Sequence, residues 1–265
     1  SGAAEVVIAG GVGGYSRGPE RWRTDPAGGA SVRYEQARFT PWAARDPQMG
    51  VAAAALAERL GISRQAQDEW AVASHARARV RAGEIVPVLG IERDVFARGL
   101  RVEVAARANV VCGSVTAANA AVAADGAAFV MVVSERFAAR RGLAVSGLRI
   151  LGGVTLGGDP EEPGLVPVAA IAAALARGGL RLGQVALAEV MEAYAVQAMA
   201  CVAGAGLDAA RVNVGGGALA RGHPIGASGA ILAVRLFYEL QAGIGLAAIA
   251  AAGGLGTAVL VERLE

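Results

Sequence analysis

The second half of the sequence alternates β-branched runs with alanine-rich stretches, and this alternation constrains the fold more than any other feature. Short β-branched runs predict buried strands, and apolar residues at helical spacing predict helices. We expect strands at 127–134, 148–156, 185–190 and 212–214, helices at 135–141, 166–177, 195–205 and 228–241, and a closing hairpin at 247–262. Strands that alternate with helices favour an α/β sheet covered on both faces.

The first half has fewer regular patterns. We expect a buried strand at 6–11, a long irregular segment at 13–50, helices at 49–60 and 63–82, and a strand at 84–88. The irregular segment is rich in glycine, proline and arginine, which is typical of a stretch that moves or covers a site. Ser63 precedes the second helix and predicts its N-terminal cap.

The basic residues are all arginine, and the sequence contains no lysine. A GC-rich genome explains this bias best, because arginine and alanine codons are GC-rich. The net charge of +2 gives no reason to expect nucleic acid as a partner. Scattered arginines still suit a phosphate-bearing ligand, because a guanidinium offers paired hydrogen bonds.

Two cysteines, Cys112 and Cys201, are too few for a disulfide framework or a four-thiolate metal site. We therefore expect no metal and a reducing, cytoplasmic compartment. Cys201 lies among apolar neighbours, which predicts a buried structural thiol. No apolar run is long enough for a membrane span, and residues 1–5 show no pattern of a signal peptide.

A glycine-rich stretch with one histidine, residues 213–230, is the most informative part of the chain. A strand runs into a turn that carries His223 and Pro224, and a helix begins directly afterwards. Glycines allow the backbone to approach a ligand closely, and the N-terminus of the following helix favours negative charge. Pro224 is expected to hold the His223 ring in one orientation at the floor of a pocket.

This stretch resembles the thiolase signature Asn-Val-x-Gly-Gly-Ala-x-Ala-x-Gly-His-Pro-x-Gly-Ala-Ser-Gly, with one extra glycine at Gly215. The resemblance extends over essentially the whole chain, through residues 4–11, 16–19, 48–50, 61–68, 115–119 and 125–128. It implies a layered αβαβα architecture whose first half is truncated. It also implies acyl transfer between acyl-CoA and acetyl-CoA as the family's activity.

The resemblance implies a nucleophilic cysteine on a helix that precedes the strand at 6–9, so we expect that residue to be missing. Neither cysteine present can replace it by position. Cys112 precedes the segment that matches the family's pantetheine tunnel, and Cys201 lies late in a helix. We therefore expect no nucleophilic thiol in the site.

A second family cysteine, an acid and base in a glycine-rich turn near the C-terminus, aligns with Ala250. Alanine has no proton to exchange, so we expect general acid–base catalysis to be lost at that position. The next glycine of the family turn aligns with Ala252. Its backbone N–H is still expected to point into an oxyanion pocket, since that role needs no side chain.

A third departure lies at residues 191–195, which resemble the family sequence Asn-Glu-Ala-Phe-Ala. The family asparagine holds a water beside the histidine, and here it is Met191, which cannot position water. Ala121 likewise replaces a serine that contacts pantetheine in many family members. His223 would then be the one catalytic residue retained.

We expect the chain to be a catalytically impaired pseudo-enzyme related to lipid metabolism. It would bind CoA or acyl-CoA as ligand or co-substrate, with no covalently bound cofactor. The resemblance assigns substrate or CoA binding to Met49, Arg107, Asn119, Tyr194 and Ala252. Two alternatives stay open, namely an active thiolase whose nucleophile segment is on another chain or missing from this sequence, and a non-catalytic structural or partner subunit.

The expected organisation has three parts. Residues 1–20 and 110–135 would form a remnant of the N-terminal thiolase half, 21–109 a loop or lid region, and 136–265 the C-terminal half. A truncated first half would uncover a sheet edge and the apolar face of the strand at 6–8. We therefore expect a homo-oligomer or a companion thiolase chain as partner.

Overall fold

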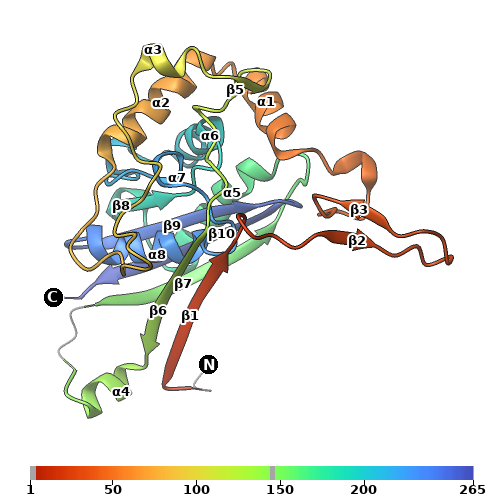
Figure 1. Cartoon of the computed structure of the whole chain (residues 1–265). Coiled ribbons are helices and arrows are strands. Elements are labelled where there is room, and N and C mark those ends of the chain that lie inside the picture. Colours follow the sequence, from red (N-terminus) through yellow and green to blue (C-terminus); the bar gives the residue numbers. More distant parts are fainter. Residues whose placement is uncertain (1–3, 144–146, 265) are drawn as a thin grey trace.

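The computed structural model describes residues 4–143 and 147–264 (Figure 1). Residues 1–3, part of the stretch where we expected no signal peptide, lie outside the described ranges, as do 144–146 and 265. Among the described residues, no helix is both long and apolar enough to cross a membrane.

The C-terminal half contains a four-stranded sheet in the order β7-β10-β9-β8. Its strands are β7 (Leu148–Gly157), β8 (Val185–Val190), β9 (Ile244–Ala251) and β10 (Leu255–Arg263). They confirm the strands and closing hairpin predicted here. β10 runs antiparallel to β7 and β9, and β8 pairs parallel with β9, so among these described strands β10 is the one that runs in the opposite direction. The short turn between β9 and β10 makes an antiparallel pair necessary.

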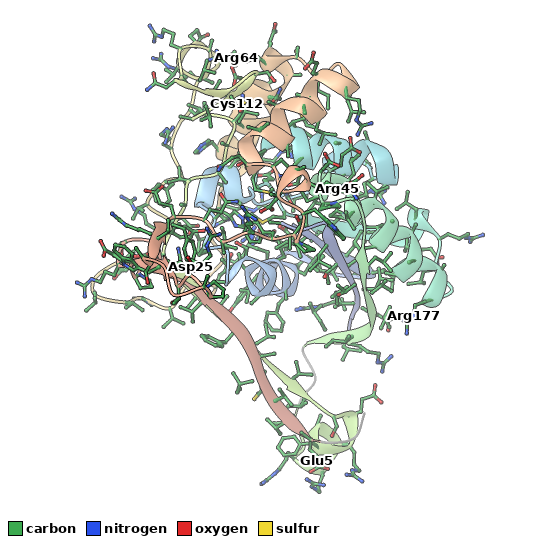
Figure 2. The ribbon with its side chains drawn as sticks, turned by 90° about the vertical axis from the view of Figure 1, so that its right-hand side faces the viewer. Glu5, Asp25, Arg45, Arg64, Cys112 and Arg177 are labelled. Atoms are coloured by element: carbon green, nitrogen blue, oxygen red, sulfur yellow. The ribbon has the colours of Figure 1, made fainter. Side chains whose placement is uncertain are left out.

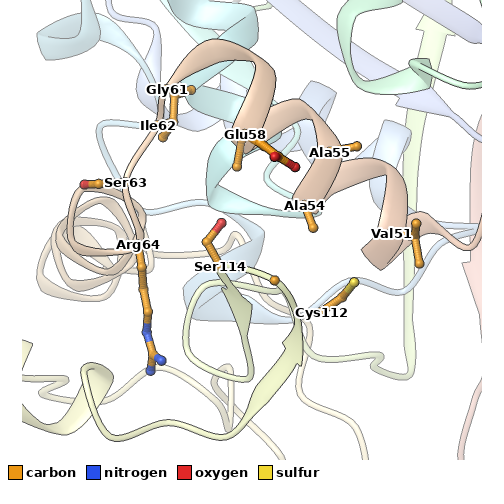
Figure 3. Close-up of a pocket in the computed structure, with 12 residues that line it drawn as sticks. Val51, Ala54, Ala55, Glu58, Gly61, Ile62, Ser63, Arg64, Cys112 and Ser114 are labelled. Carbon is orange, nitrogen blue, oxygen red and sulfur yellow. The ribbon is translucent and has the colours of Figure 1, made fainter.

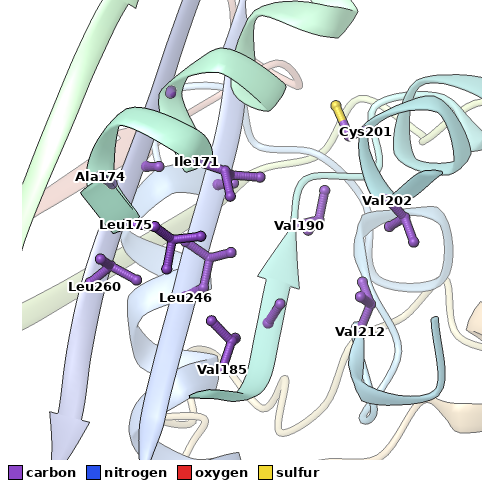
Figure 4. Packing of buried hydrophobic residues seen from close by; sticks show 14 of the residues in the cluster. Ile171, Ala174, Leu175, Val185, Val190, Cys201, Val202, Val212, Leu246 and Leu260 are labelled. Carbon is purple, nitrogen blue, oxygen red and sulfur yellow. The ribbon is translucent and has the colours of Figure 1, made fainter. Parts of the chain in front are cut away.

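Helices cover both faces of this sheet, as the sequence predicted. α5 (Val166–Arg177) and α6 (Ala195–Ala205) lie on one face, and α8 (Ser228–Glu239) lies on the other. Alternate strand residues divide between the two sides, since Leu246 packs toward α5 while Ala247 packs toward α8. Figure 4 shows Ile171 and Leu175 of α5 beside Leu246 and Leu260 of the sheet.

A two-stranded pair, β1 (Val6–Gly13) with β6 (Gly126–Val133), forms the next layer. α8 contacts both this pair and the four-stranded sheet, so it lies between them. The order is therefore helices, sheet, helix, strand pair, which confirms the thiolase-like layered α/β architecture.

The prediction that the first strand is buried is wrong. Ile8 is 63% exposed and Val12 is 64% exposed, and Phe129 and Met131 of β6 share their outward face. α8 packs against the pair from the other side, and no described element covers the outer face. Burial of a strand depends on the layers above and below it, which the strand's own residues do not reveal.

A helical layer lies above the sheet and contains α1 (Met49–Leu60), α2 (Arg64–Arg77) and α3 (Val102–Ala105), with β4 (Val110–Cys112) and β5 (Val115–Thr116) beside them. α1 and α2 pack on α6. The α1 prediction is confirmed, and Ser63 caps α2 by accepting a hydrogen bond from the Ala66 N–H at 3.1 Å. α2 ends before the predicted residue 82.

The strand predicted at 84–88 is wrong. Val86 is 78% exposed and Leu89 is 99% exposed, and this stretch forms only an isolated bridge between Val88 and Ile91. β-branched residues alone do not make a strand without a neighbouring strand to pair with.

The remaining elements are short: β2 (Arg21–Arg23), β3 (Val32–Tyr34), η1 (Ala43–Arg45), α4 (Glu135–Arg140), η2 (Pro163–Leu165), η3 (Leu182–Gln184), η4 (Ala209–Arg211) and α7 (Ala218–Arg221). The β2–β3 hairpin projects away from the layers (Figure 1). Arg45 pairs with Asp159 and Glu161 and so ties the segment after the hairpin to the end of β7. Glu5 lies at one end of the molecule, opposite the end that carries Arg64 (Figure 2), and it pairs with Arg136 and Arg140 of α4.

Candidate functional site

The candidate site lies where three parallel neighbours, β8, β9 and the segment at 212–214, reach their carboxyl ends at one edge of the sheet. Val212 forms a parallel bridge with Ala188 of β8, so the segment predicted as a strand at 212–214 runs beside β8 without forming a full strand. On the other side of β8, the Met191 N–H donates to the Ala248 carbonyl of β9 at 2.9 Å. Met191 and the loop to His223 therefore leave the sheet at the same edge, where α/β sheets usually bind ligands.

Asn213 turns the chain from the sheet into the glycine-rich loop, which is the part of the 213–230 stretch that precedes α8. Its φ of 47° is left-handed, which asparagine tolerates better than most residues. Its side-chain oxygen accepts the Val190 N–H at 2.8 Å, and its amide donates to the Val190 carbonyl at 2.8 Å. Asn213 thus fixes the loop to the end of β8, a role that the sequence reasoning missed although the motif begins at this residue.

Glu192 anchors the glycine-rich loop to α2. Its buried carboxylate accepts hydrogen bonds from Trp70 Nε1 at 3.0 Å and Ser74 Oγ at 2.7 Å, both in α2. It also accepts from Asn213 Nδ2 at 2.9 Å and the Leu219 N–H at 3.3 Å, both in the loop. Sequence reasoning missed this role, although Glu192 matches the Glu of the family sequence Asn-Glu-Ala-Phe-Ala and is a carboxylate inside an apolar stretch.

The loop glycines are required by close contact with α2. A Cβ at Gly216, where φ is 80°, would lie 2.6 Å from the Ser74 carbonyl oxygen. A Cβ at Gly217 would lie 2.3 Å from a Glu192 carboxylate oxygen. The loop therefore rests directly on the C-terminal part of α2 and on Glu192.

Hydrogen bonds fix both the backbone and the ring of His223. Its backbone N–H donates to the Val122 carbonyl at 2.7 Å, and its Nδ1 lies 2.7 Å from Ser228 Oγ. Ser228 Oγ donates to the Pro224 carbonyl at 3.0 Å. Because a hydroxyl has one hydrogen, Ser228 must accept from His223 Nδ1–H, which leaves Nε2 as the basic nitrogen.

Burial lowers the pKa of His223 to about 4. The ring is therefore neutral near pH 7, with a lone pair on Nε2. A neutral imidazole can accept a proton or a hydrogen bond from a ligand, but it is not a cationic donor.

The segment 119–123 joins His223 to the segment that carries Met191. The Ala121 N–H donates to the Ala193 carbonyl at 2.9 Å, and the next residue, Val122, accepts from the His223 N–H. Ala120 also forms a bridge with Tyr194, which is half-buried at the start of α6. These contacts bring His223, Ala121, Tyr194 and the buried Met191 into one region.

Asn119 is fully buried and hydrogen-bonded within the chain. Its amide donates to Asp68 Oδ1 at 2.9 Å and to the Ser114 carbonyl at 3.2 Å, and its side-chain oxygen accepts the Thr116 N–H at 2.8 Å. Both amide hydrogens are used, so its evident contribution is to order the 114–123 segment. Its direct contact with a ligand stays a prediction.

Ala250 and Ala252 lie at the end of the β9–β10 hairpin. Ala250 is half-buried near the end of β9, opposite Gly256 of β10, and Ala252 lies in the turn. The turn is packed closely, since a Cβ at Gly254 would lie 2.6 Å from the Gly158 carbonyl oxygen. β9 is parallel to β8, so Ala250 lies at the same carboxyl edge as Met191.

Met49 and Arg107 belong to the helical layer above the sheet. Met49 is half-buried at the first turn of α1, and Arg107 is exposed after α3. The Arg107 segment is fixed by Arg64, whose Nη2 donates to the carbonyls of Ala106 at 2.9 Å and Ala108 at 3.0 Å. The described contacts do not bring the Arg107 side chain to the other predicted site residues.

The two cysteines lie in different environments. Cys201 is fully buried, donates to the Gly164 carbonyl at 2.8 Å, and has its pKa raised to about 11 by burial. The predicted burial of this thiol is thus confirmed. Cys112 is half-buried in the wall of an open cavity of about 600 Å³ between α1, the start of α2 and the β4–β5 turn (Figure 3).

Comparison with known proteins identifies the family. The profile of the thiolase N-terminal domain matches residues 1–136, and that of the C-terminal domain matches residues 145–263. An acetyl-CoA acetyltransferase of Pseudomonas aeruginosa is 38% identical over 292 residues, covering 99% of this chain and 73% of that protein. The chain belongs to the thiolase family.

Solved thiolase structures share the fold. Human mitochondrial 3-ketoacyl-CoA thiolase matches with a TM-score of 0.88 and 31% identity, over 100% of this chain and 73% of that chain. The Acat5 thiolase of Ascaris suum, solved in complex with coenzyme A, matches with a TM-score of 0.88 and 29% identity, over 99% of this chain and 73% of that chain. The likeness therefore extends through both halves of this chain.

Proposed function

We propose that this chain binds coenzyme A or acyl-CoA at the carboxyl edge of its sheet and does not catalyse acyl transfer on its own. One observation carries the proposal. Met191 and Ala250 provide only apolar side chains at the edge where thiolase chemistry would need polar and proton-exchanging ones. His223 remains, with a neutral ring and a basic Nε2.

The chemistry of acyl transfer supports the second half of this proposal. Claisen condensation and thiolysis need a nucleophilic thiol and a group that exchanges the α-proton. The methyl group of Ala250 cannot exchange a proton. Cys201 cannot supply the nucleophile, because a thiol whose pKa is about 11 stays protonated near pH 7.

Retention of the loop scaffold supports binding. Asn213, Glu192 and Ser228 still hold His223 in one place. A relative solved with coenzyme A shares this fold at a TM-score of 0.88. The N–H of Ala252 stays our candidate for an oxyanion donor, and Met49, Arg107, Asn119 and Tyr194 stay candidates for contacts with the ligand.

An active thiolase completed by a second polypeptide is the second candidate. The exposed apolar face formed by Ile8, Val12, Phe129 and Met131 favours it, because such a face is expected to pack against a partner. A structural subunit of a larger thiolase assembly would use the same face.

We also assign the protein to the cytoplasm, a reducing compartment that suits its two free cysteines.

Calorimetry tests the binding proposal. We expect weak, salt-sensitive heat with coenzyme A and roughly tenfold weaker binding of 3′-dephospho-CoA, because a 3′-phosphate is recognised by paired arginine donors. Arg107→Leu should weaken binding of coenzyme A, while Arg177→Leu, a change at an exposed arginine that ends α5, should not. No heat with either compound would argue for a purely structural role.

A further inference from the structure

The segment from residue 79 to residue 98, here called the cover segment, lies along the glycine-rich loop. The Arg79 N–H donates to the Gly215 carbonyl at 3.2 Å, and Arg79 Nη1 donates to the Val214 carbonyl at 2.8 Å. Near its other end, a Cβ at Gly222 would lie 3.0 Å from the Phe96 ring. Figure 1 shows this stretch between α2 and α3 passing beside α7 and α8.

Arg221 connects the loop to both ends of the cover segment. Its nearly buried guanidinium donates through Nε to the Gly216 carbonyl at 3.0 Å and through Nη2 to the Gly215 carbonyl at 2.6 Å. Nη2 also donates to the Arg79 carbonyl, and Nη1 pairs with the Asp94 carboxylate. One side chain therefore joins two loop carbonyls to residues 15 positions apart in the cover segment.

A second buried ion pair holds the first part of the cover segment against α8. Arg235 of α8 pairs with Glu84 through Nη1 at 2.5 Å and with Glu239 through Nη2 at 2.9 Å. Arg79 and Arg81 also pair with Glu239. This first part of the cover segment is thus fixed to α8 independently of Arg221, whereas Asp94, further along the segment, is held by Arg221.

Buried ion pairs contribute little net stability, because desolvation offsets much of the attraction. Their geometry is specific, however, since a guanidinium offers a rigid fork of donors that an ammonium does not. Arg221 is two residues from His223, and the intervening Gly222 is left-handed, with a φ of 94°, and lies against Phe96 and Ala124. Phe96 therefore lies against Gly222, the residue that joins Arg221 to His223.

We propose that Arg221 is a positioning residue, which latches the cover segment onto the glycine-rich loop and thereby keeps the His223 ring enclosed and fixed. The assignment rests on contacts within the chain and is independent of coenzyme A binding. The latch depends on the fork of donors and not on the positive charge alone.

The chain has two histidines, so NMR can follow the titration of each ring in the full protein. His223 should titrate near pH 4 in the unaltered chain. We expect Arg221→Leu and Arg221→Lys both to raise the pKa of His223 toward its ordinary value of 6.5, because both open the enclosure. Asp94→Asn, which keeps the arginine, should give a smaller rise. Arg177→Leu serves as the matched control and should leave the titration unchanged.

An Arg221→Lys titration like that of the unaltered chain, with a shift only in Arg221→Leu, would show a charge effect and overturn the proposal. Unchanged titration in both would also overturn it. If Arg221→Leu does not fold, Asp94→Asn decides the matter through hydrogen exchange of the Arg79 amide, which donates to Gly215. The latch predicts exchange at least about tenfold faster in Asp94→Asn, and an unchanged rate contradicts it.

Discussion

Glu189 is a buried carboxyl group outside the candidate site. It lies in β8, it is buried, and its Oε1 has no hydrogen-bond partner among the described residues. Burial raises the pKa of Glu189 to about 8, although the charges of Arg235 and Arg221 oppose the rise. Arg235 Nε is likewise buried without a partner in the described part of the chain. Glu189 should therefore bind a proton near pH 7.

Because the pKa of Glu189 is raised, we expect the free energy of unfolding to fall as pH rises, including above pH 6.5, where the two histidines contribute little. Unfolded Glu189 loses its proton near its ordinary pKa of 4.5, whereas folded Glu189 keeps it up to about 8. The free energy of unfolding should therefore fall as pH rises between these values, by at most about 1.4 kcal/mol per pH unit. The buried histidines, with pKa values lowered to about 4 from 6.5, act in the opposite sense and only below pH 6.5.

Urea unfolding between pH 6.5 and 8 isolates the Glu189 contribution. Glu189→Gln should remove the fall in stability over this range. A slope that is the same in the variant and in the unaltered chain would show that Glu189 is already ionised in the folded protein.

The sequence predicted the surroundings of a residue correctly where the motif that contains it is one continuous stretch. The stretch around His223 identified the loop, its glycines and the following helix, because all lie within consecutive residues. The partners of Glu192 could not be predicted, since Ser74 lies 118 positions away in sequence. The same holds for Arg221 and Asp94, which are 127 positions apart.

Between elements, the contact of α2 with the glycine-rich loop depends on one carboxylate. Glu192→Ala would leave the donors of Trp70, Ser74 and Asn213 without their acceptor in a buried place. We expect a loss of about 3 kcal/mol in the free energy of unfolding, measured by urea titration. Glu58→Ala, at an exposed position of α1, should change it by less than about 0.5 kcal/mol. Equal effects of the two changes would contradict the anchoring role of Glu192.

Elements were predicted best where a regular pattern is reinforced by packing on both sides. The bounds of α5, β8 and α6 agree with those expected from the sequence. The strand expected at 84–88 failed, because that segment is held by side-chain ion pairs and not by strand pairing. Its β-branched residues indicated only a local preference for extended backbone.

The β1–β6 pair carries an exposed apolar face that includes Ile8, Val12, Phe129 and Met131. We expect the purified chain to associate through this face, with itself or with a companion thiolase chain. Ile8→Glu should shift the population toward smaller species in size-exclusion chromatography with light scattering. A stable monomer in the unaltered chain, with β1 amides that exchange freely, would show that this face needs no partner.

At the scale of the whole molecule, we propose that the chain keeps a thiolase scaffold for its ligand but not thiolase chemistry. Thiolysis of acetoacetyl-CoA by free coenzyme A, measured with the purified chain alone, tests it most directly. We predict no turnover above background, because Ala250 cannot exchange an α-proton and no nucleophilic thiol is placed beside His223 in the described part of the chain. Clear turnover that is lost on His223→Ala would show instead that the chain is an active thiolase.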